Sequence, residues 1–172
     1  MNKRPVILHM GTKPNKNLER VLEALNKMNC LLIIVGKLTF RQSQILKDYR
    51  IDYENYFDVD YAEIVQYYQK CDIVSFPSTY EGFGLPILEA NAVGRPILVG
   101  DIEVLHEIAG NAAYFVDPMD TDAIKQGFIE LLNNSDLRSN LISCGLQNVQ
   151  RFTPKAIAVQ YNDLYNSLLR GK

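Results

Sequence analysis

The sequence of 172 residues contains few cysteines, and their placement excludes two structural classes. Cys30, Cys71 and Cys144 are odd in number and widely spaced. They match neither the disulfide framework of a small secreted domain nor the paired spacing of a zinc site. We therefore interpret them as reduced thiols and expect a cytoplasmic protein.

The sequence also lacks a strong charge and a long apolar run. Its formal net charge is −2 at pH 7, whereas a nucleic-acid-binding protein usually shows a basic face. No apolar run approaches the roughly 18 residues of a membrane span. The start of the chain, Met-Asn-Lys-Arg-Pro, leads too abruptly into an apolar run to be a signal peptide. We expect no nucleic-acid partner and no membrane-spanning segment.

The chain does contain a regular alternation of apolar runs and amphipathic segments, which is typical of repeated β-α units. We predict strands at residues 6–10, 31–35, 56–59, 73–76, 96–99 and 113–116. Helices are predicted between them at 17–28, 40–49, 61–70, 85–93 and 102–109, and then in succession at 121–133, 136–151 and 154–169. The pattern predicts one α/β domain over residues 1–172, a Rossmann-like doubly wound parallel six-stranded sheet with residues 121–172 as a helical tail.

The expected topology predicts where a ligand binds. Open parallel sheets bind ligands beyond the carboxyl ends of the strands, where the strand order reverses. With the strand order 3-2-1-4-5-6, the first and fourth strands flank this crevice. The loops that follow them, residues 11–16 and 77–84, are also rich in glycine and charged residues.

The second of these loops opens the most informative segment, P-S-T-Y-E-G-F-G-L-P-I-L-E at residues 77–89. Backbone N–H groups at a helix start bind anions, and Gly82 and Gly84 let the backbone approach a ligand closely. The carboxylates of Glu81 and Glu89 accept hydrogen bonds from hydroxyl groups. Sites for a phosphate and for a polyol, placed together, indicate a nucleotide-sugar.

Glu89 is expected on a helix that is apolar on nearly every side. A buried carboxylate needs partners, because an unpaired buried charge costs several kcal/mol. Ribose hydroxyls would provide them, and the alternative is a pairing with backbone amides or with Arg95. Glu81 is expected in an exposed loop, where it can accept from the hydroxyls of a transferred sugar.

The first loop, Gly11-Thr12-Lys13-Pro14-Asn15-Lys16-Asn17, places Lys16 just before a helix. A charge-assisted bond from Lys16 to phosphate contributes roughly 1.5–3 kcal/mol, and more as charge builds on a departing diphosphate. The alternative is a solvated surface lysine beside a helix cap formed by Asn15 or Asn17. Lys13 is a weaker candidate for the same role.

Other polar residues have simpler explanations. Asp58 and Asp60, like Asp120 and Asp122, have the D-x-D spacing of a metal-diphosphate site. Asp60 and Asp120 also stand where helices begin, so we interpret them as caps and expect no metal. His9 and His106 lack a partner pattern, and we interpret the tyrosines at 53, 56, 61, 67 and 68 as core or solvent-facing.

The segment P-S-T-Y-E-G-F-G-L-P-I-L-E-A at 77–90 resembles the E-x7-E region of the retaining glycosyltransferases of family 4, the group 1 transferases. Similar segments run through nearly the whole chain: G-T-K-P-N-K-N-L at 11–18, L-L-I-I-V-G at 31–36, V-G-R-P-I-L-V at 93–99, Y-F-V-D-P at 114–118 and R-F-T-P at 151–154. The E-G-F-G-L-P-x-x-E run is the specific motif, and the others support it.

The resemblance implies the C-terminal, nucleotide-sugar-binding half of a GT-B fold. It also implies transfer of a sugar from a UDP or GDP conjugate with retention, in glycan biosynthesis, without a metal or other cofactor. Glu89 would bind ribose and Glu81 the donor sugar, with Glu81 and Lys16 as the catalytic pair. The remaining binding residues implied are Gly11, Thr12, Gly82, Phe83, Gly84 and Leu85. Thr12 and Asn15 stand where many relatives carry an arginine.

The resemblance also implies a missing partner. An N-terminal acceptor-binding half, in this or another polypeptide, would complete the enzyme and would carry any peripheral membrane association. Alone, the chain is expected to bind the donor weakly and to transfer essentially nothing. The alternatives are a non-catalytic nucleotide-sugar-binding module and half of a GT-B sugar-nucleotide epimerase. A phosphoacceptor receiver domain would need an acidic cluster after the first strand, where Leu8-His9-Met10-Gly11 offers none.

Overall fold

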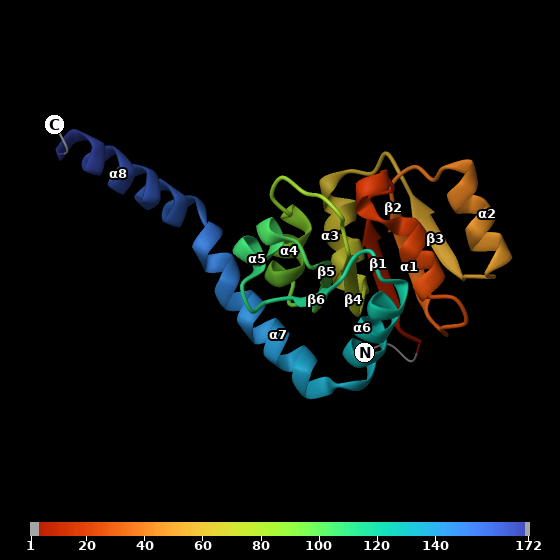
Figure 1. Cartoon of the computed structure of the whole chain (residues 1–172). Helices are drawn as coiled ribbons and strands as arrows, with labels where there is room; N and C mark the ends of the chain where they lie inside the picture. The colour runs from red at the N-terminus through yellow and green to blue at the C-terminus, as the bar shows by residue number, and fades with distance from the viewer. Residues whose placement is uncertain (1–3, 171–172) are drawn as a thin grey trace.

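The computed structural model describes residues 4–170 and is built around a parallel sheet (Figure 1). The strands are β1 (Val6–Met10), β2 (Leu31–Val35), β3 (Tyr53–Tyr56), β4 (Ile73–Phe76), β5 (Ile97–Gly100) and β6 (Tyr114–Val116). Their spatial order is β3-β2-β1-β4-β5-β6, and every neighbouring pair is parallel. The predicted strand order is confirmed, and the order reverses between β1 and β4.

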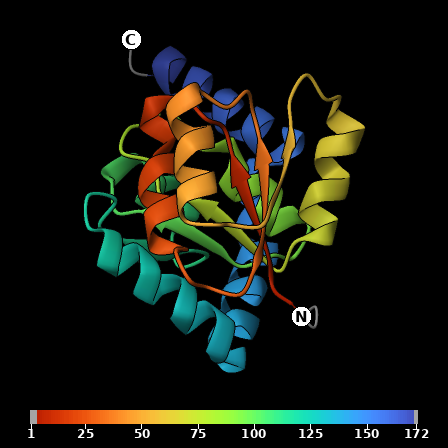
Figure 2. The same cartoon turned by 90° about the vertical axis from the view of Figure 1, so that its right-hand side faces the viewer.

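Helices cover both faces of the sheet (Figure 2). The helical elements are η1 (Pro14–Lys16), α1 (Leu18–Ala24), α2 (Phe40–Asp48), α3 (Tyr61–Lys70), α4 (Leu85–Ala92), α5 (Glu103–Ala109), α6 (Thr121–Asn133), α7 (Ser135–Asn148), η2 (Val149–Phe152) and α8 (Pro154–Arg170). Successive strand residues point to opposite faces, so Ile7 packs in one core with α1, α2 and α6, while Leu8 packs in the other with α3, α4 and α5. The sheet is therefore doubly wound, as expected.

Three predicted elements differ from the structure by more than one residue at an end, and backbone conformation explains the differences. The third strand is not at 56–59 but at Tyr53–Tyr56, because Tyr56 already pairs with the last residue of β2 and Asp58 adopts a left-handed φ of 59°. The helix predicted at 17–28 begins only after Asn17, which has a φ of 63°, and α1 ends at Ala24. The helix predicted at 136–151 ends at Asn148 and continues as the 3-10 turn η2.

One aspartate of each D-x-D pair, Asp60 and Asp120, caps a helix, as predicted. Asp60 accepts from the backbone N–H of Glu63, whose side chain accepts in return from the N–H of Asp60. Asp120 accepts from the N–H groups of Asp122 and Ala123 at the start of α6. Each cap satisfies donors that the helix leaves without partners.

Buried side-chain contacts fix the loops at the carboxyl edge of the sheet. Asn17, which is buried, donates from Nδ2 to the carbonyl oxygens of Pro77 at 3.0 Å and Pro118 at 2.6 Å. This one amide ties together the loops that follow β1, β4 and β6. Gly100, at the end of β5, lies against the backbone of Ser78 so closely that a Cβ atom would overlap the Ser78 carbonyl oxygen.

His9 on β1 is fully buried beneath these loops. Its Nδ1 lies 3.1 Å from Oγ of Ser75 on β4, and its Nε2 has no hydrogen-bond partner among the described residues. Burial, with a smaller contribution from the charge of Lys16, lowers the pKa of His9 from 6.5 to about 3. His9 is therefore neutral in the folded protein at physiological pH.

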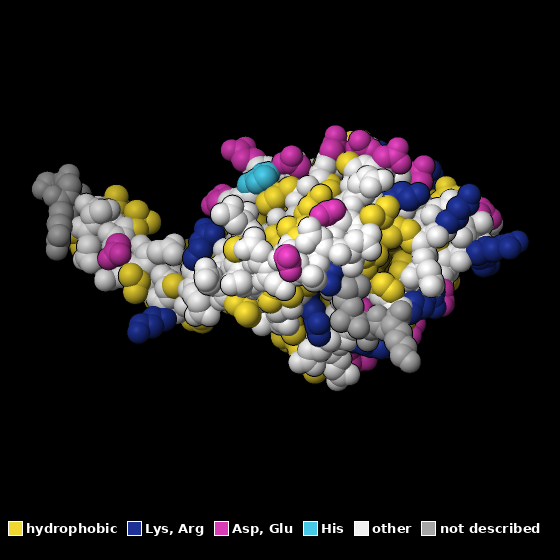
Figure 3. Space-filling view, turned by 90° about the horizontal axis from the view of Figure 1, so that it is seen from below, with side chains coloured by type: hydrophobic (Ala, Val, Ile, Leu, Met, Phe, Trp, Pro, Cys, Tyr) yellow, Lys and Arg dark blue, Asp and Glu magenta, His cyan; other side chains and the backbone are white. Residues whose placement is uncertain are grey.

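Helix α8 differs from the other helices because it extends away from the sheet (Figure 1). Large apolar side chains along it are exposed, and Figure 3 shows them on the protruding segment. The set is Val159, Tyr161, Leu164, Tyr165, Leu168 and Leu169. Within residues 4–170, no helix combines the length and the apolar character that a membrane-spanning segment needs.

We expect Gly100→Ala to destabilise the fold, because the new methyl group has to displace the Ser78 backbone. Overpacking of this kind costs roughly 1–3 kcal/mol. Gly82→Ala is the matched control, since Gly82 is exposed and a Cβ there meets nothing within 4 Å, so its effect should stay within about 0.5 kcal/mol. Urea unfolding measures both, and equal stabilities of the two variants would contradict the packing described.

We also expect His9 to make the fold sensitive to acid. Its pKa is near 6.5 unfolded and about 3 folded, so its neutral burial stabilises the fold fully above pH 6.5 and progressively less down to pH 3. The loss is about 1.4 kcal/mol per pH unit inside that window. In urea unfolding between pH 6.5 and 4.5, His9→Gln should lose roughly 2–3 kcal/mol less than the unsubstituted chain. Identical losses would show that His9 does not titrate in this way.

Candidate functional site

The two predicted ligand loops are joined by direct hydrogen bonds. The backbone N–H of Thr79 donates to the carbonyl oxygen of Asn15 at 2.9 Å. The Asn15 side chain donates from Nδ2 to the carbonyl oxygen of Tyr80 at 3.0 Å. Parallel pairing of β1 with β4 ends both strands at one edge, so these loops are neighbours despite their distance in the chain.

Lys16 and Glu81 form an ion pair where these loops meet. Lys16 Nζ lies 2.7 Å from Glu81 Oε1, and the two side chains are only 21% and 11% exposed. Nζ also lies 4.7 Å from the centre of the Phe76 ring. Lys16 is therefore not the solvated surface lysine of the alternative interpretation, and the two predicted catalytic residues are brought together.

Gly11 and Gly84 allow this close arrangement. Gly11 has a φ of 90°, and a Cβ there would lie 2.8 Å from Cγ of Lys16, so the lysine stem occupies the space that a side chain would fill. Gly84 has a φ of 108°, and a Cβ there would come 2.8 Å from Leu105. Both glycines lie where a larger residue would be strained and would clash.

The start of α4 is open to an anion. Gly84 is its N-cap residue and supplies no capping side chain. Pro86 has no N–H, and the N–H of Ile87 already donates to the carbonyl oxygen of Gly84 at 3.0 Å, so the N–H groups of Gly84 and Leu85 are the ones offered to a ligand at this helix start. Phe83 and Leu85 on either side are exposed, and Gly82 has open space around it. Phe83 makes an edge contact with Phe152 of η2, with ring centres 5.9 Å apart.

Thr12 makes hydrogen bonds that hold the first loop in place. Its hydroxyl donates to the carbonyl oxygen of Lys37 at 2.7 Å, and its own carbonyl oxygen accepts from the side chain of Gln42 at 3.0 Å. These bonds tie the first loop to the segment after β2. Thr12 lies beside the site rather than at the ion pair.

Glu89 has a partner that neither interpretation of the sequence included. The Tyr68 hydroxyl donates to Glu89 Oε2 at 2.7 Å. Arg95, the proposed alternative partner, donates instead to the carbonyl oxygens of Tyr68 at 3.2 Å and Gln69 at 2.5 Å. Glu89 thus faces α3, one turn along α4 from the open helix start.

Sequence reasoning missed Tyr68 and Asn17. Nothing in the spacing of Tyr68 distinguishes it from the four neighbouring tyrosines as a phenol that faces a carboxylate. Asn17 precedes a helix as a capping residue would, yet its side chain makes no cap bond. The signal for Asn17 was its position in the turn after β1, where a polar side chain can reach the neighbouring loops.

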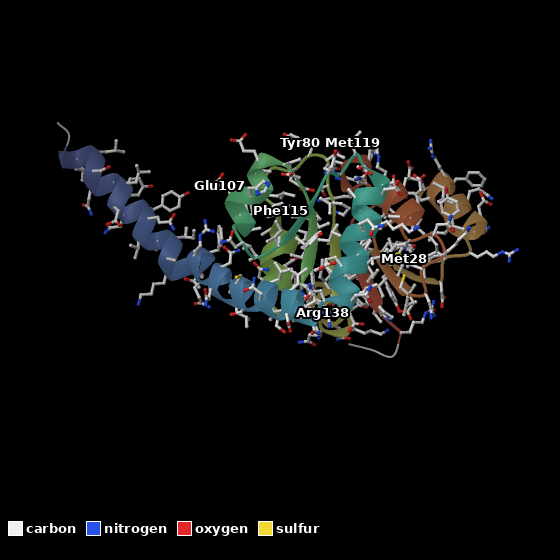
Figure 4. The ribbon with its side chains drawn as sticks, turned by 60° about the horizontal axis from the view of Figure 1, so that its bottom comes forward. Met28, Tyr80, Glu107, Phe115, Met119 and Arg138 are labelled. Atoms are coloured by element: carbon white, nitrogen blue, oxygen red, sulfur yellow. The ribbon has the colours of Figure 1, made fainter. Side chains whose placement is uncertain are left out.

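Two grooves border this region. The larger, about 730 Å³, lies between α1 and α2 and contains Thr12, Lys13, Arg20 and Arg41, but no residue of the 77–89 segment. The smaller, about 220 Å³, lies between α3 and α4 and contains Glu89. We place the candidate site at the ion pair and the start of α4, because Lys16, Glu81 and the first backbone N–H groups of α4 meet there, with Glu89 one turn further along the helix. In Figure 4 Tyr80, beside Glu81 in the chain, marks this edge of the molecule, with Met119 near it and Arg138 toward the opposite end.

A protein-family model and a curated relative each match most of this chain. The chain matches the family model Glycosyl transferases group 1 over residues 1–147. It is similar to the O-antigen chain mannosyltransferase B of Escherichia coli, with 29% identity over 175 residues that include 94% of this chain and 45% of that protein. The chain thus spans less than half the length of this curated relative.

Solved structures share the fold. Sucrose-phosphate synthase from Thermosynechococcus elongatus superimposes with a TM-score of 0.84 at 23% identity, over 99% of this chain and 47% of that one. Anabaena Alr3699/HepE, in complex with UDP and glucose, superimposes with a TM-score of 0.75 at 20% identity, over 95% of this chain and 48% of that one. The chain has the Rossmann-like architecture of about half of a GT-B glycosyltransferase, and it belongs to the family Glycosyl transferases group 1.

Proposed function

We propose that the chain is the donor-binding half of a retaining glycosyltransferase of family 4. The complete enzyme would move a hexose from a nucleoside diphosphate, UDP or GDP, to an acceptor hydroxyl in cytoplasmic glycan biosynthesis. The observation that carries the proposal is the partly buried pair of Lys16 and Glu81 beside the uncapped start of α4.

The pair suits a sugar diphosphate because it offers one partner to each part of that ligand. The ammonium group of Lys16 and the N–H groups of α4 attract the diphosphate. The carboxylate of Glu81 accepts hydrogen bonds from sugar hydroxyls. Without a ligand, Lys16 and Glu81 form an ion pair with each other. With a ligand, Lys16 would contact the diphosphate and Glu81 a sugar hydroxyl.

The same groups favour the transfer step. As the bond between the sugar and the diphosphate breaks, negative charge accumulates on the leaving diphosphate. Lys16 and the helix start stabilise this charge more strongly in the transition state than in the bound donor. Because these groups supply the positive charge, the proposed reaction requires no metal ion or other cofactor.

Two of the similar proteins support this assignment. The Anabaena protein of the same fold binds UDP and glucose, which are the parts of a nucleotide-sugar. The relative from Escherichia coli is a mannosyltransferase. We infer a nucleotide-sugar donor for this chain, with Glu89 at the ribose as the family resemblance implies.

We propose a second half as the partner, in the same or another chain. Exposed apolar residues lie in the segments that follow the carboxyl ends of the strands, including Phe57, Tyr80, Phe83 and Met119. Helix α8 presents a further unpartnered apolar set. An acceptor-binding half that covers both surfaces would exclude water from the donor and position the acceptor, and it would also carry any membrane association.

We expect Lys16→Met to weaken nucleoside diphosphate binding by roughly ten- to a hundredfold, which corresponds to loss of one charge-assisted bond. Calorimetric titration of the chain with UDP, GDP and ADP measures this change. Lys13→Met is the matched control, because Lys13 lies in the same loop and is exposed. If Lys16→Met binds the nucleoside diphosphates as tightly as the unsubstituted chain, Lys16 does not contact the diphosphate.

We expect Glu81→Ala to remove the preference for the sugar conjugate over the parent nucleoside diphosphate. Binding of the nucleoside diphosphate itself should persist, because Lys16 and the start of α4 remain. Calorimetric titration with UDP-glucose against UDP, and with GDP-mannose against GDP, separates the two contributions. An unchanged preference, with unchanged activity of the complete enzyme, would favour a nucleotide-binding module over a transferase.

A further inference from the structure

Tyr68 is buried, and its hydroxyl group hydrogen-bonds a charged side chain. Its side chain is 1% exposed and packs among the apolar residues between α3, α4 and the sheet. Its hydroxyl reaches the rim of this core and lies 2.7 Å from Glu89 Oε2. The residue therefore joins the core to the carboxylate that we place at the ribose.

The direction of this hydrogen bond is fixed. Burial raises the pKa of Tyr68 well above its ordinary value, and the neighbouring negative charge of Glu89 raises it further. The phenol keeps its proton and donates it to Oε2. Among the described residues Tyr68 is the one side chain that hydrogen-bonds the Glu89 carboxylate, so Oε1 is left to accept from a ligand.

The backbone of Tyr68 is also fixed by hydrogen bonds. Its carbonyl oxygen accepts from Nε of Arg95 at 3.2 Å and from Sγ of Cys71 at 3.3 Å. Arg95 follows α4 in the chain and also donates to Gln69. These bonds tie the end of α3 to the segment after α4, so the backbone that carries the phenol is fixed relative to α4.

The surroundings of Glu89 increase the importance of this contact. The groove of about 220 Å³ beside it is lined mainly by apolar side chains, including Ile64, Val65 and Val93. Few other groups there can orient the carboxylate, and a hydrogen bond in apolar surroundings is stronger than one in water. Without the phenol, the flexible glutamate side chain would have to be ordered when the ligand binds.

We propose that Tyr68 is a positioning residue that fixes Glu89 so that Oε1 accepts from the vicinal hydroxyls of a ribose. The site then distinguishes ribonucleotides from nucleotides that lack these hydroxyls. The proposal rests on the proposed function, in which Glu89 lies at the ribose of the donor.

The test is calorimetric titration of Tyr68→Phe with UDP, GDP and ADP, each beside its 2′,3′-dideoxy counterpart. Tyr68→Phe should weaken ribonucleotide binding about five- to tenfold, as expected for one hydrogen bond, and leave dideoxynucleotide binding unchanged. In a Glu89→Ala background, Tyr68→Phe should have no further effect. Tyr67→Phe is the matched control, since Tyr67 is on the same helix but stacks on Tyr56.

Any result that differs from these expected ones overturns the proposal. An equal loss for ribose and dideoxyribose ligands would show that Tyr68 only supports the fold, and urea unfolding of the variant would register that role. Unchanged binding of both ligand sets would show that Glu89 needs no orientation by the phenol. If the unsubstituted chain binds none of the six nucleotides, the proposed function fails, and the role of Tyr68 fails with it.

Discussion

The parallel pairing of β1 with β4 is the constraint on which the rest of the structure depends. The strand order reverses there, so the loops after these strands have no helix between them and approach each other directly. Asn17 then joins these loops to the one after β6. The two hydrogen bonds of the buried amide take the place of water at two backbone carbonyls and fix the relative position of these loops.

Burying most of a lysine and a glutamate side chain costs free energy, because both charged groups lose contact with water. Removing two charges from water costs several kcal/mol per ion unless their geometry compensates. In this chain Lys16 and Glu81 meet at 2.7 Å, and the Phe76 ring supports the ammonium group. Under the proposed function, the pair holds a positive and a negative group in place for the diphosphate and the sugar of the donor, which lowers the cost of ordering these side chains on binding.

Helix α4 links the two ends of the proposed site. Its uncapped start lies beside the ion pair, and Glu89 one turn later faces α3. The apolar side chains of α4, such as Ile87 and Ala90, are buried against the sheet and fix the helix axis. Glu89 lies on this helix and Glu81 in the loop that precedes it, with Tyr68 and Lys16 as their separate partners.

The alternation of apolar and amphipathic segments by itself determined the order of the elements, the sheet topology and the edge at which the loops meet. Glycine and charge in two loops identified Lys16, Glu81 and the start of α4, because backbone freedom and charge are visible in local sequence. The pairing partners were decided only by the tertiary structure. Tyr68 meets Glu89, and Arg95 does not, because side-chain contacts between distant elements depend on how helices pack, which local spacing does not encode. The third strand ended at Tyr56 for the same reason, since pairing with β2 sets where it stops.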